Sequence, residues 1–351
     1  MTIERENVMV ALSGGLDSSV TAALLLEAGF DCSGVFMITG EQSRHAQEGA
    51  EHVAKRLGIG LTILDLRPEF EEILAYFCRE YGTGRTPNPC VLCNRTVKFG
   101  RLWEFAKNAG ARYLATGHYA RLIPRNGCTG LYEGADSQKD QSYVLSMVRR
   151  EVLNRVRLPM GEYSKEQARQ IAARLGLGTE ARQESQEICF IPDDDHIAVL
   201  ESRHPELVRE GPIVDSAGTI LGTHQGVHRY TIGQRRGLRV AMGKPYYVTG
   251  LDPEQNTVML GPREEVMHRR LRAGGINWLI DEPRSAFPAI VKIRYNDRGK
   301  AATVLPEGSR AVVEFDGPNA AITPGQLAVF YISEGDMRRV AGAGWIDEAM
   351  D

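Results

Sequence analysis

Residues 8–19 of this chain join an apolar run, a glycine-rich turn and the start of a helix. The run Val8–Leu12 has the composition of a buried strand, and residues 20–28 have that of a helix. Between them, Gly14 and Gly15 allow positive φ angles and a close approach of the backbone to a ligand. The N–H groups and the dipole at the start of a helix favour an anion there. The segment therefore predicts a phosphate site after the first strand of an α/β domain.

The predicted phosphate loop carries neither of two common signatures. It has no Gly-Lys-Ser/Thr ending, so no loop lysine reaches a terminal phosphate, and it does not follow the GxGxxG pattern. The order Ser-Gly-Gly-Leu-Asp-Ser at residues 13–18 resembles the pyrophosphate loop of the ATP pyrophosphatases, which transfer AMP from ATP to a substrate oxygen. An ordinary glycine-rich turn in an α/β protein is the alternative interpretation.

Strand-like and helix-like segments alternate from residue 8 to about residue 119. Strands are expected at 33–38, 61–66 and 113–116, helices at 43–57, 69–81 and 97–109, and a helix-poor loop at 82–94. Further helices are expected at 140–149 and 164–175. This alternation predicts a parallel sheet with helices on both faces and ligands at the carboxyl ends of its strands. The loop, Met37 and Gly117-His118 would then surround one crevice.

The pattern of the sequence changes after about residue 197, where short runs typical of β-strands and glycine-containing turns predominate. Regularly spaced short strands predict small β modules, with a barrel at the end of the chain. The predicted fold is therefore α/β, with a parallel-sheet ATP pyrophosphatase-like domain (1–196), a small central β-rich domain (197–268) and a C-terminal β-barrel-like domain (269–351).

The overall composition limits the class of protein. The chain has 351 residues, 42% hydrophobic and 25% charged, which is typical of a globular protein with ample core. Residues 1–7 are polar, and no apolar run is long enough to span a bilayer. Six cysteines without an export signal predict reduced thiols in the cytoplasm. The net charge of −3 neither indicates nor excludes a nucleic-acid partner.

Three cysteines lie in segments that suggest chemistry. Cys90 and Cys93 form Cys-Val-Leu-Cys, and Cys189 lies in ESQEICFI. The absence of a second Cys-x-x-Cys argues against a structural zinc site, unless Cys189 and a histidine complete one. Cys32 and Cys78 lie in apolar patterns and are expected to be buried small hydrophobes, and Cys128 looks incidental.

Family-like segments run nearly from end to end of the chain. They are ALSGGLDSS, GVFM, RTPNPCVLCNRTVKF, ATGHYAR, KDQSYVL, ESQEICFI, HRYTIGQRRGL, KIRY and TPGQLAVF. With these segments the chain resembles the tRNA-specific 2-thiouridylase family, which replaces the C2 oxygen of the wobble uridine of certain tRNAs with sulfur.

The resemblance implies a role for ATP and Mg²⁺. ATP would adenylate the uridine C2 oxygen, and Asp17 would help to hold Mg²⁺, which prefers carboxylate and phosphate oxygens. The residues implied in nucleotide binding are Ala11, Leu12, Ser13, Gly14, Gly15, Leu16, Asp17, Ser18, Met37 and Gly117.

The resemblance implies that Cys189 carries a persulfide and that Cys93 is the nucleophile that frees the sulfur, attacking it or forming a disulfide with Cys189. Many family members have aspartate at the position of Cys90. Three thiolates from Cys90, Cys93 and Cys189 could instead ligate a [4Fe–4S] cluster whose fourth iron binds sulfide. Both mechanisms stay open. The sulfur donor also stays open, and is either a relay protein or sulfide. Arg95, Lys98 and His118 are expected to supply positive charge to the thiolates.

The resemblance also implies tRNA contacts. They fall on Asn88, Pro89, His118, Lys139, Asp140, Gln141, Arg294, Tyr295 and Gln326. The segment HRYTIGQRRGLR adds Arg229, Arg235, Arg236 and Arg239, which suit phosphate binding. Two other functions remain as alternatives. One is another AMP-forming ligase, which would need no cysteine pair, and the other is a non-catalytic RNA-binding or iron–sulfur protein.

Overall fold

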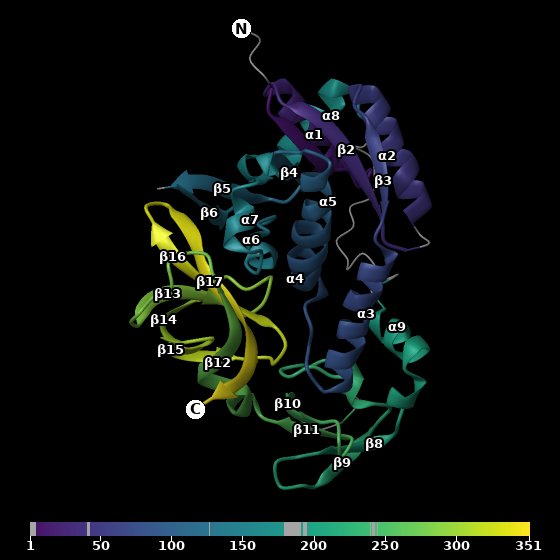
Figure 1. The fold of residues 1–351 in the computed structure, drawn as a ribbon. Helices are drawn as coiled ribbons and strands as arrows, with labels where there is room; N and C mark the ends of the chain where they lie inside the picture. The colour runs from purple at the N-terminus through teal and green to yellow at the C-terminus, as the bar shows by residue number, and fades with distance from the viewer. Residues whose placement is uncertain are drawn as a thin grey trace.

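The first structural unit is a five-stranded parallel sheet in the order β3-β2-β1-β4-β7 (Figure 1). The computed structural model describes residues 5–40, 43–125, 127–178, 191, 195–238, 240, 243 and 245–351. The strands of this sheet are β1 (Asn7–Ala11), β2 (Asp31–Ile38), β3 (Leu61–Asp65), β4 (Tyr113–Ala115) and β7 (Val156–Arg157). The parallel sheet expected from the βα alternation is confirmed.

Helices cover both faces of this sheet because the side chains of β1 alternate between them. Val8 and Val10 pack with α1 (Leu16–Glu27) and α2 (Ser43–Leu57). Met9 and Ala11 point the other way, into a core that includes Phe99 and Leu102. A strand buried on both sides needs the near-continuous apolar run that the sequence shows at this place.

Three helical expectations need correction. The segment 82–94 contains a short helix, α4 (Pro89–Cys93), after α3 (Arg67–Gly82). The predicted helix 97–109 is a π-helix, η1 (Asn94–Leu102), continued by α5 (Trp103–Asn108). The predicted helix 140–149 is replaced by α6 (Ser142–Leu145) and α7 (Arg150–Leu153). By contrast α8 (Lys165–Leu175) follows the prediction, with a capping box at Ser164 and a left-handed Gly176 at its end.

The central unit is a four-stranded sheet in the order β10-β11-β8-β9. Its strands are β8 (Gly211–Val214), β9 (Ile220–His224), β10 (Tyr247–Asp252) and β11 (Thr257–Gly261). Helix α9 (His196–Arg203) precedes it, and a small core around Val248, Val258 and Leu260 holds it together. The short strands expected in this region are confirmed.

The C-terminal unit is an antiparallel barrel of six strands, closed by pairing of β12 with β17. The strands are β12 (Met267–Trp278), β13 (Phe287–Lys292), β14 (Lys300–Glu307), β15 (Arg310–Ala320), β16 (Leu327–Glu334) and β17 (Met337–Met350). A hairpin that the sequence did not predict, β5 (Ala120–Arg125) with β6 (Cys128–Glu133), extends the barrel sheet beside β17. The N-terminal unit is thus attached to the barrel by strand pairing (Figure 1).

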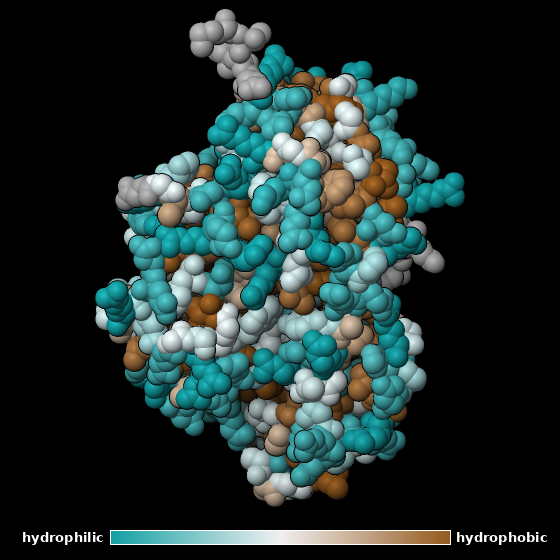
Figure 2. All heavy atoms as spheres, in the orientation of Figure 1, coloured by the Kyte–Doolittle hydropathy of each residue, from teal (hydrophilic) through white to brown (hydrophobic). Residues whose placement is uncertain are grey.

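Hydrophilic side chains cover most of the face shown in Figure 2. Among the residues that the structure describes, no helix is both long and apolar enough to cross a membrane.

Candidate nucleotide and thiol site

The loop after β1 is folded around the hydroxyl of Ser18. Ser18 Oγ accepts a hydrogen bond from the backbone N–H of Ser13 at 3.1 Å and lies 3.1 Å from Ser13 Oγ. It also donates to the carbonyl of Gly15 at 3.2 Å, as Ser19 Oγ does at 2.7 Å. These bonds fix the loop at the N-terminus of α1, where the helix dipole attracts anions.

Two glycines allow this loop to pack closely against its neighbours. Gly14 has φ +73°, and a Cβ there would lie 2.3 Å from the carbonyl oxygen of Ala46 in α2. A Cβ on Gly117, which follows β4, would lie 2.8–2.9 Å from backbone and Cβ atoms of Asp17 and Ser18. Gly14 therefore allows the loop to pack on α2, and Gly117 allows the segment after β4 to approach the start of α1.

A lysine from a distant helix supplies the cation that the loop itself lacks. Lys165, the first residue of α8, donates from Nζ to both carboxylate oxygens of Asp17 at 2.9 Å. Tyr119 OH donates to Asp17 Oδ1 at 2.7 Å. Sequence reasoning missed Lys165 and Tyr119, although the helix expected at 164–175 includes the lysine. Asp17, named as a Mg²⁺ ligand, is thus paired with an ammonium group in this structure.

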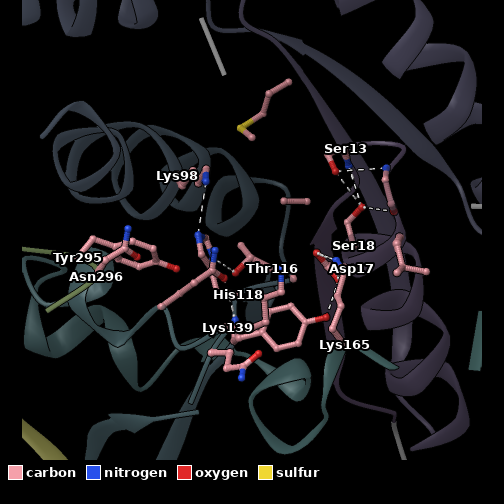
Figure 3. A pocket seen from close by; sticks show the side chains of 18 residues that line it. Ser13, Asp17, Ser18, Lys98, Thr116, His118, Lys139, Lys165, Tyr295 and Asn296 are labelled. Atoms are coloured by element: carbon pink, nitrogen blue, oxygen red, sulfur yellow. Dashed lines mark hydrogen bonds and ion pairs between the residues drawn. The ribbon is translucent and has the colours of Figure 1, made fainter. Parts of the chain in front are cut away.

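These residues line one side of a cavity of about 780 Å³. Figure 3 shows Ser13, Asp17, Ser18 and Lys165 on that side, facing Lys98, Tyr295 and Asn296 across the space. Of the predicted site residues, the cavity is lined by Ala11, Ser13, Gly15, Leu16, Asp17, Ser18, Met37, Gly117, His118, Lys139, Gln141 and Tyr295. Residues that were not predicted as binding residues also line it, namely Lys98, Thr116, Tyr119, Gln138, Lys165 and Asn296. Leu12 and Gly14 are buried behind the loop.

His118 does not carry the positive charge expected of it. Its side chain is buried, and this burial, with the nearby Lys98 ammonium, holds the pKa of the imidazole well below its usual value. Lys98 Nζ lies 3.5 Å from His118 Nε2, and Thr116 Oγ1 lies 2.7 Å from Nδ1. Because an ammonium only donates, Nε2 accepts and Nδ1–H donates to Thr116. Lys98, whose side chain extends from the π-helix, is the cation of this wall.

Helix α4 carries two of the three candidate thiols. Cys90 and Cys93 are three residues apart, which places them on one side of the helix. Cys93 is buried in an apolar cluster with Phe70 and Val97, against which the cavity residue Met37 packs. Cys90 is half-buried, and its thiolate is a minor cause, after desolvation and Asp140, of the raised pKa of the Tyr295 phenol. Cys93 therefore lies in a cluster that contacts a residue of the cavity lining, and Cys90 is within electrostatic range of another such residue.

Cys189 lies outside the residues that the structure describes. Among those residues, no group of three or more His, Cys, Asp and Glu side chains could hold a metal ion. The three-cysteine set named from the sequence is therefore not placed by this structure. Cys32 and Cys78 are buried as expected, and burial raises the pKa of both thiols, that of Cys32 to about 11.

Asp140 is part of a buried network and not of an exposed surface. Its side chain is 6% exposed and accepts hydrogen bonds from Gly134 N, Ser142 N and Ser142 Oγ. The buried Lys292 of β13 lies 3.5 Å from Asp140 and 2.7 Å from Glu133. This ion-pair network joins the N-terminal unit to the barrel. Gln141, in turn, accepts a hydrogen bond from the N–H of Tyr119 at 2.9 Å.

The other predicted tRNA residues lie around the loop that precedes α4. Asn88 Oδ1 accepts from Val91 N at 3.3 Å and so caps α4, with Pro89 buried at its first position. Gln326 donates from Nε2 to the carbonyls of Thr86 and Pro87. In the central unit, Arg229 pairs with Glu201, whereas Arg235 and Arg236 are exposed. Arg239 lies outside the described residues.

The parallel sheet, the Ser-Gly-Gly loop at its carboxyl edge and the cations around that loop define an adenine-nucleotide-binding domain followed by two β domains. Three family models match accordingly, described as tRNA methyl transferase HUP domain (residues 6–193), tRNA methyl transferase PRC-barrel domain (198–262) and aminomethyltransferase beta-barrel domain (268–346).

Curated relatives match over the whole length. The tRNA-specific 2-thiouridylase MnmA of Carboxydothermus hydrogenoformans is 45% identical and that of Syntrophotalea carbinolica 44%, over 99% of this chain and 99% and 100% of theirs. The chain belongs to the tRNA-specific 2-thiouridylase family, a family of tRNA-modifying enzymes. Among solved structures, NMN synthetase from Francisella tularensis aligns with 58% of this chain and 78% of its own at 15% identity and a TM-score of 0.36.

Proposed function

We propose that this enzyme uses ATP to replace the C2 oxygen of a wobble uridine in tRNA with sulfur, in the cytoplasm. One observation carries the proposal. A single cavity is bounded by the loop at Ser13–Ser18, and Cys93 of α4 lies in the apolar cluster against which the lining residue Met37 packs, with Cys90 one helical turn before it. Nucleotide chemistry and thiol chemistry can therefore act on one bound base.

The first step is adenylation. The uridine C2 oxygen attacks the α-phosphorus of ATP, a P–O bond forms, and pyrophosphate leaves with the electrons of the broken bond. The loop N–H groups and Lys165 suit the pyrophosphate, and Lys98 on the opposite wall suits negative charge near the base. This step converts the C2 oxygen into part of AMP, which is a good leaving group.

Mg²⁺ would be held by Asp17 together with phosphate oxygens. A third of the Asp17 side chain remains exposed toward the cavity, which fits a carboxylate that completes the coordination of a phosphate-bound ion. The ion would neutralise phosphate charge. Lys165 then needs a new partner, and the phosphate oxygens next to Asp17 provide one.

Two alternative mechanisms of sulfur delivery are part of this proposal, and they are called the persulfide form and the cluster form. In the persulfide form, the terminal sulfur on Cys189 attacks C2, Cys93 attacks Cys189 Sγ to form a disulfide, and AMP departs. A thiol reductant then restores both cysteines. In the cluster form, Cys90 and Cys93 provide two ligands from one helical turn and Cys189 the third. Such a cluster would supply an open iron position that binds sulfide.

The tRNA would bind across the mouth of the cavity and the exposed Arg235 and Arg236. Lys139, Tyr295 and Asn296 are among the residues that line the cavity. Arginine suits phosphate, and the half-exposed Tyr295 ring suits stacking on an extruded base. A strong dependence of affinity on salt follows from this mode of binding.

The test is the identity of the product. Unmodified tRNA is incubated with the protein, Mg²⁺-ATP and either sulfide or a persulfide donor, and its nucleosides are analysed by mass spectrometry. The proposal expects 2-thiouridine with release of AMP and pyrophosphate. Nucleosides that stay unmodified although AMP is formed, or AMP formation without tRNA, would contradict it.

Iron and acid-labile sulfide separate the two forms of sulfur delivery. About four of each per chain in protein purified without oxygen, lost in Cys90→Ala, would establish the cluster form. Their absence after attempted reconstitution, with full thiolation by Cys90→Ala, would establish the persulfide form.

A further inference from the structure

The turn at residues 321–326, between β15 and β16, touches all three structural units. Its Ala321 accepts a hydrogen bond from Arg294 Nη2 at 3.1 Å and donates its N–H to Val266 O at 2.8 Å. Ala321 also has φ +54°, a strained conformation for a residue with a side chain. Such strain persists only where surrounding contacts hold the backbone in place.

On one side, this turn is joined to the central unit. Arg294 Nη2 donates to Ile232 O at 3.2 Å and to the buried Thr323 Oγ1 at 2.8 Å, so one guanidinium nitrogen spans both segments. Gly233 packs so tightly on Ala321 that a Cβ on Gly233 would lie 2.1 Å from the Ala321 Cβ. Ile232 and Gly233 lie in the turn Thr231–Gln234, immediately before the exposed Arg235 and Arg236.

On its other side, the same turn holds the segment that leads into α4. Thr86 N donates to Pro324 O at 2.9 Å, and Gln326 Nε2 donates to Thr86 O and Pro87 O at 3.0 and 3.1 Å. Gly325, at φ +91°, allows the contact, because a Cβ there would lie 2.8 Å from Thr86 O. Asn88, two residues after Thr86, caps the helix that carries Cys90 and Cys93.

We propose that the turn 321–326 couples the RNA-facing turn of the central domain to the cysteine helix. In this arrangement Arg294 and Gln326 are positioning residues, whether or not they also touch RNA. A shift of Thr231–Gln234 on contact of Arg235 and Arg236 with tRNA would pass through Ala321 and Gln326 to residues 86–88, and would set the position of the two thiols. The role that this coupling would have in catalysis rests on the proposed function, but the experiment that tests the coupling does not.

The test uses glycine substitutions, which change no charged or hydrogen-bonding side chain. Gly233→Ala introduces the clash with Ala321, and Ala321→Gly in the same chain removes the atom that it meets. Gly335→Ala is the matched control. Gly233 and Gly335 both have a positive φ, +84° and +62°, but a Cβ on Gly335 meets nothing within 4 Å. Hydrogen–deuterium exchange of peptides covering residues 86–94 is measured in the full chain without tRNA.

The coupling predicts that the exchange rate of residues 86–94 is at least about threefold higher in Gly233→Ala than in Gly335→Ala. In the double variant Gly233→Ala/Ala321→Gly, most of this increase should be reversed. In thiolation assays Gly233→Ala should lower kcat while the KM for tRNA stays near that of the wild type. Unchanged exchange in residues 86–94 of a folded Gly233→Ala protein would overturn the coupling. So would an altered exchange that the second substitution does not reverse.

If Gly233→Ala does not fold, Gln326→Ala decides in its place. It removes the two bonds to Thr86 and Pro87 without introducing a clash, and the coupling predicts faster exchange both in residues 86–94 and in the turn Thr231–Gln234. Faster exchange in residues 86–94 alone would overturn the coupling. A residue that only contacts RNA would leave exchange in the tRNA-free protein unchanged. Because exchange is measured without turnover, a wild-type protein that makes no 2-thiouridine would disprove the proposed function and leave this result standing.

Discussion

Lys165 lies with its ammonium nitrogen 2.9 Å from both carboxylate oxygens of Asp17, although 148 residues separate the two in the sequence. Asp17 is in the first turn of α1, beside the loop that suits an anion. The pair therefore brings a partly buried cation to the place where the phosphates of a nucleotide would lie. When phosphates arrive, the lysine can donate to them and the carboxylate can turn to Mg²⁺.

Lys165→Met is expected to raise the KM for ATP by about ten- to a hundredfold, because a hydrogen bond to a charged group contributes about 1.5–3 kcal/mol. The measurement is the rate of AMP formation against ATP concentration at saturating tRNA. Arg174→Met, at the exposed end of the same helix, is the control and should leave the KM near the wild-type value. Equal KM values for Lys165→Met and wild type would show that the lysine does not bind the phosphates of ATP.

Gly117→Ala is expected to weaken ATP binding by more than about tenfold. Its Cβ would lie within 2.9 Å of Asp17 and Ser18 backbone and Cβ atoms, so the start of α1 must shift. Gly60→Ala serves as the control, since a Cβ there meets nothing within 4 Å. Calorimetric titration with a non-hydrolysable ATP analogue gives both affinities. Similar affinity in the two variants would show that the loop tolerates displacement.

Local signals in the sequence were enough for the strand, loop and helix at residues 7–27, because Ser13, Gly15 and Ser18 interact with one another. Lys165 could not be found in this way, since only the folded sheet brings α8 beside α1. Helix α4 could have been found, because Asn88 followed by Pro89 is a regular capping sequence. The segment 82–94 was instead expected to be a helix-poor loop. The β5–β6 hairpin could also have been found, because Asn126-Gly127 in the sequence is a local hairpin signal, whereas its pairing with β17 has no local signal.

His118 should make the protein less stable at low pH. The folded-state pKa of this histidine is depressed below the unfolded value of about 6.5. Below a pH of about 6.5 the imidazole is therefore protonated in the unfolded chain but still neutral in the folded chain. Stability is therefore lost as the pH falls, by up to about 1.4 kcal/mol per pH unit. Urea unfolding at pH 7 and pH 5 should show a steeper loss in wild type than in His118→Asn. Parallel losses would contradict a buried neutral imidazole.

Cys93→Ala is expected to abolish thiolation while adenylation of tRNA continues, because the cavity and the loop do not depend on the thiol. Cys78→Ala is the matched variant, a buried cysteine whose pKa is raised by burial and which lies in a separate apolar cluster. It should thiolate at close to the wild-type rate once any loss of stability is allowed for. Full thiolation by Cys93→Ala would contradict a role of this thiol in sulfur delivery.

The central claim is that the C2 oxygen of the target uridine leaves as part of AMP. Unmodified tRNA is prepared with a heavy oxygen isotope at C2 of the wobble uridine and is turned over with ATP and a sulfur source. AMP and the tRNA nucleosides are then analysed by mass spectrometry. Adenylation of the C2 oxygen predicts that the label appears in the phosphate of AMP, in equal amount with the 2-thiouridine formed. Label retained in the modified base, or AMP without label, would contradict it.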